Sequence, residues 1–458
     1  MGRRKTIENL PSAARLATAL RDVGYNFAGA VADLIDNSVA AAATRVDVTA
    51  RFNHGESWIR VADNGSGMDE ATLNEALRFG SRRDYELDDL GKFGLGLKTA
   101  SLSQCRRVLV ASRTSPRIAR LEARALDLDL MQRHDTWEID VLSATQRPTE
   151  LTEPLDQGPG TVVLWENLDR LLPYKRRDGE RARKGLLNRL EDLDQYLGMV
   201  FHRLIAGEVP RRRKLVITIN GTTVDPWDPF ARDEPGTEAL QVAEFDVIHD
   251  GNVGVVTFQP FVLPNKHQFS TPAAHERHGR GRWNQSQGLW VYRANRLIQD
   301  GGWRYLRTAD EHTKYARAAL DFSPDLDDAF GINIAKMRVN LPSSLRDDLR
   351  APVEALVRRA KQRYVEGNRD RPPPPSPTPP GSGATTDSGD PPTGGTPSPA
   401  GPGSHADGET PPSESSRGSH LGDSLERAAE EVGEQKALKR IRKRFRKIDP
   451  GAADAIGW

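Results

Sequence analysis

The sequence predicts an α+β protein whose N-terminal part is a layer of helices on one face of a mixed, largely antiparallel sheet. Helical patterns occupy the first forty residues, and short alternating strands then recur at residues 45–50, 58–61, 107–111, 118–123, 136–141 and 161–165. A third observation is a sharp change in composition near Arg371, where packed structure is expected to stop. We therefore predict a second α/β domain before that point, and a disordered linker and a C-terminal helix after it.

Two helices are expected before the first strand. Residues 12–23 have an amphipathic pattern with Leu16 and Leu20 on one side. The following helix contains Asp33 and Asn37, which are four residues apart and therefore share one face. A carboxylate and an amide at this spacing suit a water molecule and a hard cation such as Mg2+. A solvated helix face is the simpler interpretation, but the apolar residues around the pair argue against it.

The strand at residues 58–61 leads into the run Asp63-Asn64-Gly65-Ser66-Gly67-Met68. An Asp-Asn-Gly sequence is typical of a plain hairpin turn. A partner strand does not follow here, because Asp69 has the character of an N-cap for a helix through Leu73 and Leu77. The acidic residue at the end of the strand is therefore a second candidate for a binding site.

A glycine-rich stretch, Gly91-Lys92-Phe93-Gly94-Leu95-Gly96-Leu97-Lys98, runs into a third helical segment. Glycines at this spacing allow backbone N–H groups to turn inward without interference from Cβ atoms. The beginning of a helix attracts anions, and Lys98 adds a positive charge. The pattern indicates a phosphate site, although an ordinary turn before a buried helix is the alternative.

Taken in order, these motifs resemble those of the GHKL ATPases, the superfamily of gyrase B, the heat-shock chaperone, histidine kinases and MutL. The resemblance covers residues 8–170 well and extends more loosely to about residue 350. It implies a Bergerat-type α/β sandwich that binds ATP and Mg2+. Among the members of the superfamily, the Morc-like and MutL-like proteins are the most similar.

The resemblance also implies roles for individual residues. Asp33 takes the position of the general base, and Asn37 that of the magnesium ligand. Asp63 takes the position of the carboxylate that reads the adenine amino group. The remaining nucleotide-binding positions fall on Gly65, Gly67 and Met68 near the base, on Gly91, Gly94, Gly96 and Lys98 at the phosphate lid, and on Thr161, which follows Gly160 near adenine.

One departure from the family pattern concerns the general base. The family usually has Glu at this position, and Asp33 is shorter by one methylene group. A general base must reach hydrogen-bond distance of the proton that it removes. We therefore expect ATP binding together with slow hydrolysis.

The second half of the chain is predicted to contain a helical connector at residues 171–210 and a transducer-like (ribosomal S5-like) domain at residues 211–367. The segment Gly288–Ile298 resembles the strand and Asn-Arg turn of Morc-type and MutL-type transducers. In the family a transducer lysine reaches the γ-phosphate, and Lys336 is the candidate here. His267, His275 and His278 have spacing suggestive of a metal site, but a flexible surface loop is the favoured interpretation, since no cysteine or nearby carboxylate pair completes the site.

The C-terminal part changes character. Residues 368–420 contain the stretch from Arg371 to Ser419, which holds fourteen of the chain's 31 prolines and predicts a disordered linker. Residues 421–458 have the pattern of a basic amphipathic helix, with Leu438, Ile441 and Phe445 on one side. Its targets could be nucleic acid, an acidic protein or an anionic surface, and charge favours nucleic acid.

Bulk composition limits the possible classes of function. The 65 basic and 64 acidic residues nearly cancel, so that net charge does not by itself indicate a nucleic-acid-binding protein. The single cysteine, Cys105, excludes a disulfide scaffold and is expected to be a buried structural thiol. The sequence has neither an apolar stretch of membrane-spanning length nor a secretory signal pattern, so we expect a cytoplasmic protein without membrane contact.

The predicted function is that of an ATPase acting as a nucleotide-gated clamp, which forms a homodimer in the presence of ATP. The resemblance to Morc-like and MutL-like proteins implies work on or near DNA, in genome maintenance or in defence against foreign DNA. The alternative is an ATP-sensing regulatory or chaperone-like protein that hydrolyses little and acts through an unknown protein partner. A histidine kinase and a topoisomerase subunit fit less well, because the patterns show neither a preceding phospho-acceptor helix nor a cleavage domain.

Overall fold

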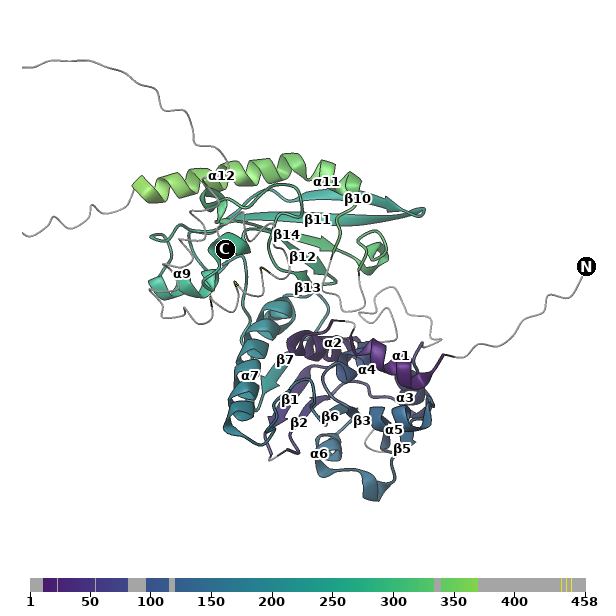
Figure 1. Cartoon of the computed structure of the whole chain (residues 1–458). Helices are drawn as coiled ribbons and strands as arrows, with labels where there is room; N and C mark the ends of the chain where they lie inside the picture. The colour runs from purple at the N-terminus through teal and green to yellow at the C-terminus, as the bar shows by residue number, and fades with distance from the viewer. Residues whose placement is uncertain are drawn as a thin grey trace, which may run out of the picture. The chain divides into compact units, whose positions relative to one another are not determined.

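The computed structural model describes residues 11–22, 24–53, 55–80, 96–114, 120–332 and 339–369, together with Leu438, Arg442 and Arg446. Two sheets and their helices belong to one compact unit, Met1–Pro375 (Figure 1). The last three described residues belong to a separate unit, Ser376–Trp458, and are helical. Of the predicted linker, only residues 368 and 369 are described, and they end a helix. All other residues of the linker, and all residues of the predicted C-terminal helix except those last three, lie outside the described residues.

The first sheet has the strand order β5-β4-β3-β6-β2-β1-β7-β8. Only the β1–β7 pair is parallel among its described strands, so the sheet is mixed and largely antiparallel, as predicted. The strands are β1 (Arg45–Arg51), β2 (Trp58–Asp63), β3 (Arg107–Arg113), β4 (Glu122–Asp127), β5 (Asp140–Val141), β6 (Gly160–Glu166), β7 (Val216–Ile219) and β8 (Thr222–Thr223).

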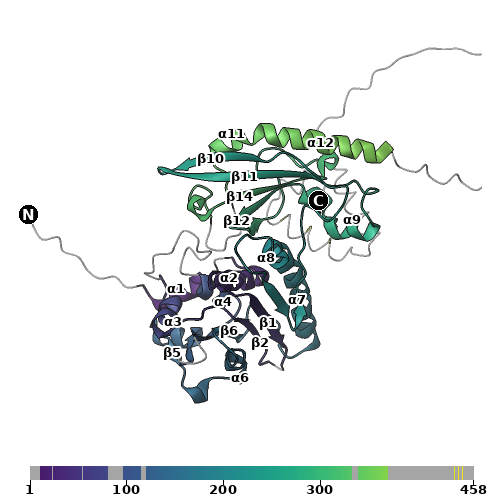
Figure 2. The same cartoon turned by 180° about the vertical axis from the view of Figure 1, so that it is seen from behind.

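Helices cover mainly one face of this sheet. They are α1 (Ala13–Leu20), α2 (Phe27–Ala40), α3 (Glu70–Leu77), α4 (Gly96–Leu102), α5 (Leu128–His134), α7 (Glu180–Val200) and α8 (His202–Ala206). The short helix α6 (Thr149–Thr152) and the 3-10 turns η1 (Ala144–Gln146) and η2 (Glu153–Leu155) complete this part of the chain. Figures 1 and 2 show α2 and α4 on one side of the strands and α6 on the other.

The alternation of side chains along the strands explains this arrangement. On β3 and β6, Val108, Val110 and Trp165 face the core beneath α2, whereas Leu109 and Leu164 face a smaller core that includes Leu151 of α6. Trp165 is fully buried and lies edge-on to Phe27, the first residue of α2, with ring centroids 6.4 Å apart. The central strands are therefore apolar on both faces, and α6 and η2 cover the second face.

The segment 171–210 is part of the first domain in this structure. The leucines of α7 at positions 186, 190, 193 and 197 follow helical spacing and enter the same core as α2. The next strand, β7, pairs in parallel with β1 in the register Val46↔Ile217. The first sheet and its core thus extend to Val224, beyond the boundaries near residues 170 and 211 that the sequence had suggested. Helices α7 and α8 connect β6 to β7 and so bring the chain back to the sheet beside β1.

The second sheet has the order β10-β11-β14-β12-β13, with β9 attached to β11. Its strands are β9 (Glu238–Ala239), β10 (Ala243–His249), β11 (Asn252–Val262), β12 (Gly288–Arg293), β13 (Arg296–Gln299) and β14 (Ala316–Phe322). Its helices are α9 (Pro272–Gly279), α10 (Trp283–Ser286), η3 (Glu311–Thr313), η4 (Pro324–Leu326), α11 (Ser343–Asp348) and α12 (Arg350–Arg369). Helices α11 and α12 run across this sheet in both views (Figure 2).

Two local expectations meet different outcomes. Cys105 is fully buried and free, as expected for a structural thiol. The expected apolar face of the first helix is wrong, because α1 buries Ala13 and Ala17 and leaves Leu16 38% exposed. The reason is tertiary: Asp135 after α5 accepts hydrogen bonds from the start of α1 and so fixes which side of the helix faces inward.

Among the described residues, no helix combines the length and apolar character needed to cross a bilayer.

Candidate functional site

Helix α2 places Asp33 at the centre of the candidate site. The side chain of Asn26 caps the helix by accepting a hydrogen bond from the N–H of Gly29 at 2.7 Å. The helix is buried along most of its length, and Asp33 is only 3% exposed, whereas Asn37, one turn later, is partly accessible. One face of α2 thus presents a buried carboxylate and a reachable amide, the pair that the spacing predicted.

Among the described residues, Tyr25 and Gly96 lie close to the Asp33 carboxylate. The hydroxyl of Tyr25 donates a hydrogen bond to its Oδ2 at 3.0 Å. Burial, and then the adjacent Asp33 charge, raise the pKa of Tyr25 above its usual value, so that the hydroxyl stays protonated as the donor. On the other side lies Gly96 at the start of α4, where an added Cβ would be 2.3 Å from the same Oδ2. Glycine at position 96 therefore allows α4 to approach the carboxylate.

Asp63, the last residue of β2, is held by three donors. Its Oδ2 accepts from the Ser38 hydroxyl of α2 at 2.9 Å, and its Oδ1 accepts from the N–H groups of Gly65 and Thr161 at 2.9 and 3.2 Å. Burial raises the pKa of Asp63, and these hydrogen bonds act in the opposite direction. Asp63 as a whole residue is partly accessible, and its carboxylate is fixed in direction, which suits recognition of a hydrogen-bond donor on a ligand.

The turn after Asp63 passes very close to neighbouring backbone. Gly67 has φ +69°, and a Cβ there would be 2.0 Å from the carbonyl oxygen of Arg113. The N–H of Met68 donates to the hydroxyl of Ser112 at 2.8 Å, and this hydroxyl lies 2.9 Å from that of Thr161. The turn is therefore packed onto the ends of β3 and β6, with Met68 half-buried at its edge.

Lys98 makes contacts different from those expected of a phosphate ligand. Its Nζ donates to the carbonyl oxygens of Ala76 and Arg78 at 2.9 and 2.6 Å, at the C-terminal end of α3. Burial lowers the pKa of Lys98 to about 8, an effect opposed by the carboxylate of Glu75. In this conformation the ammonium group caps α3, and a contact with phosphate would require it to leave these carbonyls.

The comparisons with known proteins agree with this geometry. Residues 25–161 match the family model described as "Histidine kinase-, DNA gyrase B-, and HSP90-like ATPase". Residues 25–161 form a GHKL-type ATPase domain. The matched segment begins at Tyr25, which contacts Asp33, and ends at Thr161, which contacts Asp63.

The relatives found for the GHKL domain are DNA mismatch repair proteins MutL. The protein from Shewanella halifaxensis is 36% identical over 124 residues, which are 26% of this chain and 19% of the relative. That from Actinobacillus succinogenes is 29% identical over 176 residues, or 37% of this chain and 25% of the relative. That from Rhizobium leguminosarum bv. trifolii is 38% identical over 89 residues, or 19% and 15%. The matches thus span a quarter or less of these relatives.

The GHKL domain brings together the expected residues that the structure describes. Asp33 and Asn37 lie on α2, and Gly96 lies at the start of α4 beside Asp33. Asp63, Gly65 and Gly67 belong to one turn, to which Thr161 of β6 is hydrogen-bonded. Gly91, Gly94 and Lys336 lie outside the described residues. The roles of all the expected site residues, described or not, stay predictions.

Three further side chains orient this site and were not predicted from the sequence: Tyr25, Ser38 and Ser112. Ser38 directly follows Asn37, so reading the motif one residue further would have found it. Ser112 has no such signal, because only the pairing of β3 with β6 brings it to the turn.

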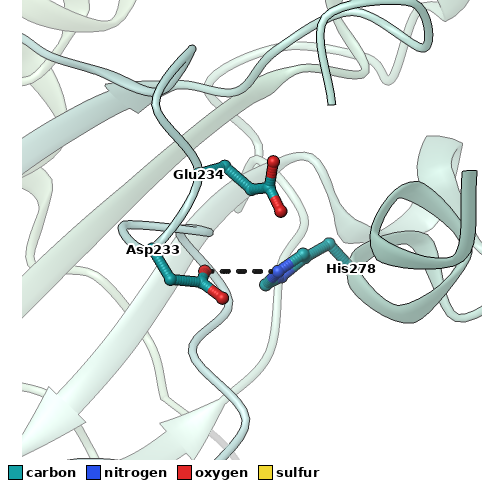
Figure 3. A group of neighbouring side chains, drawn as sticks. All are labelled: Asp233, Glu234 and His278. Carbon is teal, nitrogen blue, oxygen red and sulfur yellow. Dashed lines mark ion pairs between the residues drawn. The ribbon is translucent and has the colours of Figure 1, made fainter. Parts of the chain in front are cut away.

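A cluster outside the GHKL domain involves one of the three histidines. Figure 3 shows that Asp233 and Glu234 lie beside His278, so the structure supplies the carboxylates that the sequence around the histidines lacks. His278 Nε2 is 3.4 Å from Asp233 Oδ1, but the Arg277 guanidinium is already 2.6 Å from the other Asp233 oxygen and 3.3 Å from His278 Nε2. Both Glu234 oxygens accept hydrogen bonds from Ser270. The contacts are those of an ion-pair network.

Replacement of Gly67 by alanine is expected to destabilise the GHKL domain by about 2–4 kcal/mol, because positive φ and a collision with the Arg113 carbonyl act together. The matched control is Gly221→Ala, at φ +85° with open space around the added Cβ, for which about 1 kcal/mol of strain is expected. Urea unfolding of both variants measures the difference. Equal losses would show that the close approach at Gly67 is unimportant.

The lowered pKa of Lys98 predicts a pH dependence of stability. Between its folded pKa of about 8 and its usual 10.5, the unfolded chain binds the proton more often than the folded chain, so stability rises with pH. From pH 7.5 to 9.5 the parent should gain about 2 kcal/mol of unfolding free energy relative to Lys98→Met. Urea unfolding at both pH values tests this. A constant difference between the two proteins would contradict the buried position of the ammonium group.

Proposed function

We propose that this protein is a Mg-ATP-dependent GHKL ATPase that works as a nucleotide-gated dimeric clamp on or near DNA. The observation that carries the proposal is the Asp63 network, in which a carboxylate at the end of β2 is fixed by Ser38, Gly65 and Thr161. The matched family model supports the ATPase class. The clamp rests on similarity, and the DNA partner rests on similarity and on the basic pattern of residues 421–458.

The residues around Asp63 fit the base of ATP. The carboxylate is oriented by its donors and the residue as a whole is partly accessible, so it can accept a hydrogen bond from the adenine amino group. The turn has no room for side chains at Gly65 and Gly67. A Cβ added at Gly65 would be 2.8 Å from Ala41, and one added at Gly67 would be 2.0 Å from the Arg113 carbonyl oxygen. Met68 supplies an apolar edge beside this turn.

Asp33 and Asn37 fit the phosphate end. When bound, Mg2+ would neutralise phosphate charge and polarise the bond to be hydrolysed. Asn37 would supply an amide oxygen from the partly accessible part of α2, and Asp33 would orient a water molecule and accept its proton. Lys336 is proposed to report the intact triphosphate from the second domain, as the resemblance implies.

The clamp is inferred from the resemblance to MutL-like proteins, which the named relatives support. They are mismatch repair proteins by name, and the similarity covers the GHKL domain but only a minor part of each relative. If ATP binds the closed, dimeric state more tightly than the open state, ATP would shift the population toward the dimer. The size of the shift is set by the difference between the two affinities. The basic pattern of residues 421–458 supports nucleic acid as the surface on which the clamp acts.

A second candidate function is favoured by the surroundings of Asp33. The carboxylate is one methylene shorter than the usual glutamate, and Tyr25 occupies one of its oxygens. A base that is set back and already hydrogen-bonded turns over slowly. The chain would then be an ATP-sensing regulator acting through a protein partner.

Replacement of Asp63 by asparagine is expected to weaken binding of a fluorescent ATP analogue by about 10- to 100-fold, because the adenine amino group loses a charged acceptor. Light scattering with Mg2+ and a non-hydrolysable analogue should show a dimer for the parent and a monomer for Asp63→Asn. Asp69→Asn is the control, since asparagine caps α3 equally well. A parent that binds the analogue without changing mass would favour the regulator over the clamp.

Asp33→Asn is expected to retain analogue binding and to lose about 100-fold or more of its kcat, because the amide keeps the shape of the carboxylate but cannot accept a proton. Phosphate release under saturating Mg-ATP, with and without DNA, measures this. A variant that turns over at the parental rate would exclude Asp33 as the base. A parent with negligible turnover under both conditions would support the regulator.

A further inference from the structure

The hairpin of β12 and β13 reaches from the second sheet to the helix that carries the ATP-site residues. Nε of Arg296, the first residue of β13, donates to the carboxylate of Asp36 on α2 at 2.9 Å. The two residues are 260 positions apart in sequence. Asp36 directly precedes Asn37 and follows Asp33 by three residues. Arg296 therefore binds α2 within the same helical turn that carries Asp33 and Asn37.

This contact is sealed from solvent. Arg296 is 1% exposed and Asp36 is fully buried. Burial alone would lower the pKa of Arg296, but the carboxylates of Asp36 and, less strongly, Asp33 raise it above its usual value. The guanidinium is therefore charged, and the carboxylates of both Asp36 and Asp33 stabilise its charge. A buried ion pair tolerates little displacement, because separation would leave each charge without compensation in an apolar setting.

The hairpin is itself held firmly. Its two-residue turn, Ala294-Asn295, has φ values of +47° and +67°, and β12 ends in Arg293, which binds Asp327 with contacts of 2.6 and 2.8 Å. Arg203 of α8 donates to the Asn295 side chain at 3.3 Å and to Asp321 of β14. The hairpin is thus fixed to the second sheet and to α8, and Arg296 projects from a rigid base.

We propose that Arg296 is the positioning residue through which the second domain sets the place of α2, and with it Asp33 and Asn37, for ATP turnover. This inference rests on the proposed ATPase function. Arg296 touches neither nucleotide nor water in this scheme; it acts through Asp36. Because α2 is a single helix, a shift of the hairpin moves Asp33 and Asn37 together.

The experiment compares Arg296→Met with Arg293→Met in the full chain. Both variants remove a buried guanidinium from the same hairpin, but the partner of Arg293, Asp327, belongs to the second domain. We expect Arg296→Met and Asp36→Asn to bind a fluorescent ATP analogue within about threefold of the parent and to lose about tenfold in kcat. Arg293→Met should lower the melting temperature but change kcat by less than about threefold, because Arg203 still binds Asn295 and keeps the hairpin in place.

The double variant Asp36→Leu/Arg296→Met separates folding from positioning. Removal of both charges leaves no uncompensated buried carboxylate. The free energy of unfolding should therefore return toward the parental value. The kcat should stay about tenfold low. Recovery of stability and turnover together would overturn the inference, as would equal loss of kcat in Arg293→Met and Arg296→Met.

The outcomes distinguish this inference from the function on which it rests. Analogue-dependent dimer formation is measured by light scattering beside turnover, so a parent that binds without hydrolysing still reports coupling through its mass. In that case Arg296→Met should bind the analogue and stay monomeric; dimer formation at the parental level would overturn the inference alone. A parent that neither binds nor hydrolyses ATP would overturn both.

Discussion

The candidate site depends on the position of β6 between β2 and β3. The registers Asp63↔Thr161 and Ser112↔Thr161 bring the ends of three strands to one point. At that point the N–H of Thr161 donates a hydrogen bond to the Asp63 carboxylate, and the Ser112 hydroxyl accepts one from the N–H of Met68. A slip of one residue would turn every side chain of β6 to the opposite face, exchanging Trp165 in one core for Leu164 in the other. The apolar contrast between the two faces thus fixes the geometry of the polar turn.

Helix α2 serves two purposes at once, and this explains why it is so deeply buried. Its apolar residues pack on the sheet, while Ser38, Asp33 and Asp36 point to three different neighbours: β2, the start of α4 and the second domain. A helix carrying three acidic or polar contacts in a closed core has few alternative positions. Its position therefore couples the turn at Asp63 to the second sheet.

Buried polar contacts cross the junction between the two sheets, although each sheet has an apolar core. His202 Nε2 lies 2.9 Å from the Tyr292 hydroxyl, and burial lowers the pKa of His202 to about 3, so the ring is neutral at physiological pH. Arg203 lies 3.7 Å above the Tyr292 ring and pairs with Asp321. Directional contacts of this kind specify one arrangement more strictly than apolar packing does, because a misplaced partner leaves a buried polar group unsatisfied.

The sequence by itself determined the class of fold, the order of the motifs and the residues of the Asp63 turn, because each rests on spacing within a few residues. The helix containing Asp33 and Asn37, the N-cap at Asp69 and the strand before Thr161 are all local patterns. Only the tertiary structure decided that α7 and β7 complete the first domain, that Lys98 caps α3 and that Arg296 binds Asp36. These contacts join residues 20 to 260 positions apart, and strand register and packing decide which of many compatible charged side chains meet.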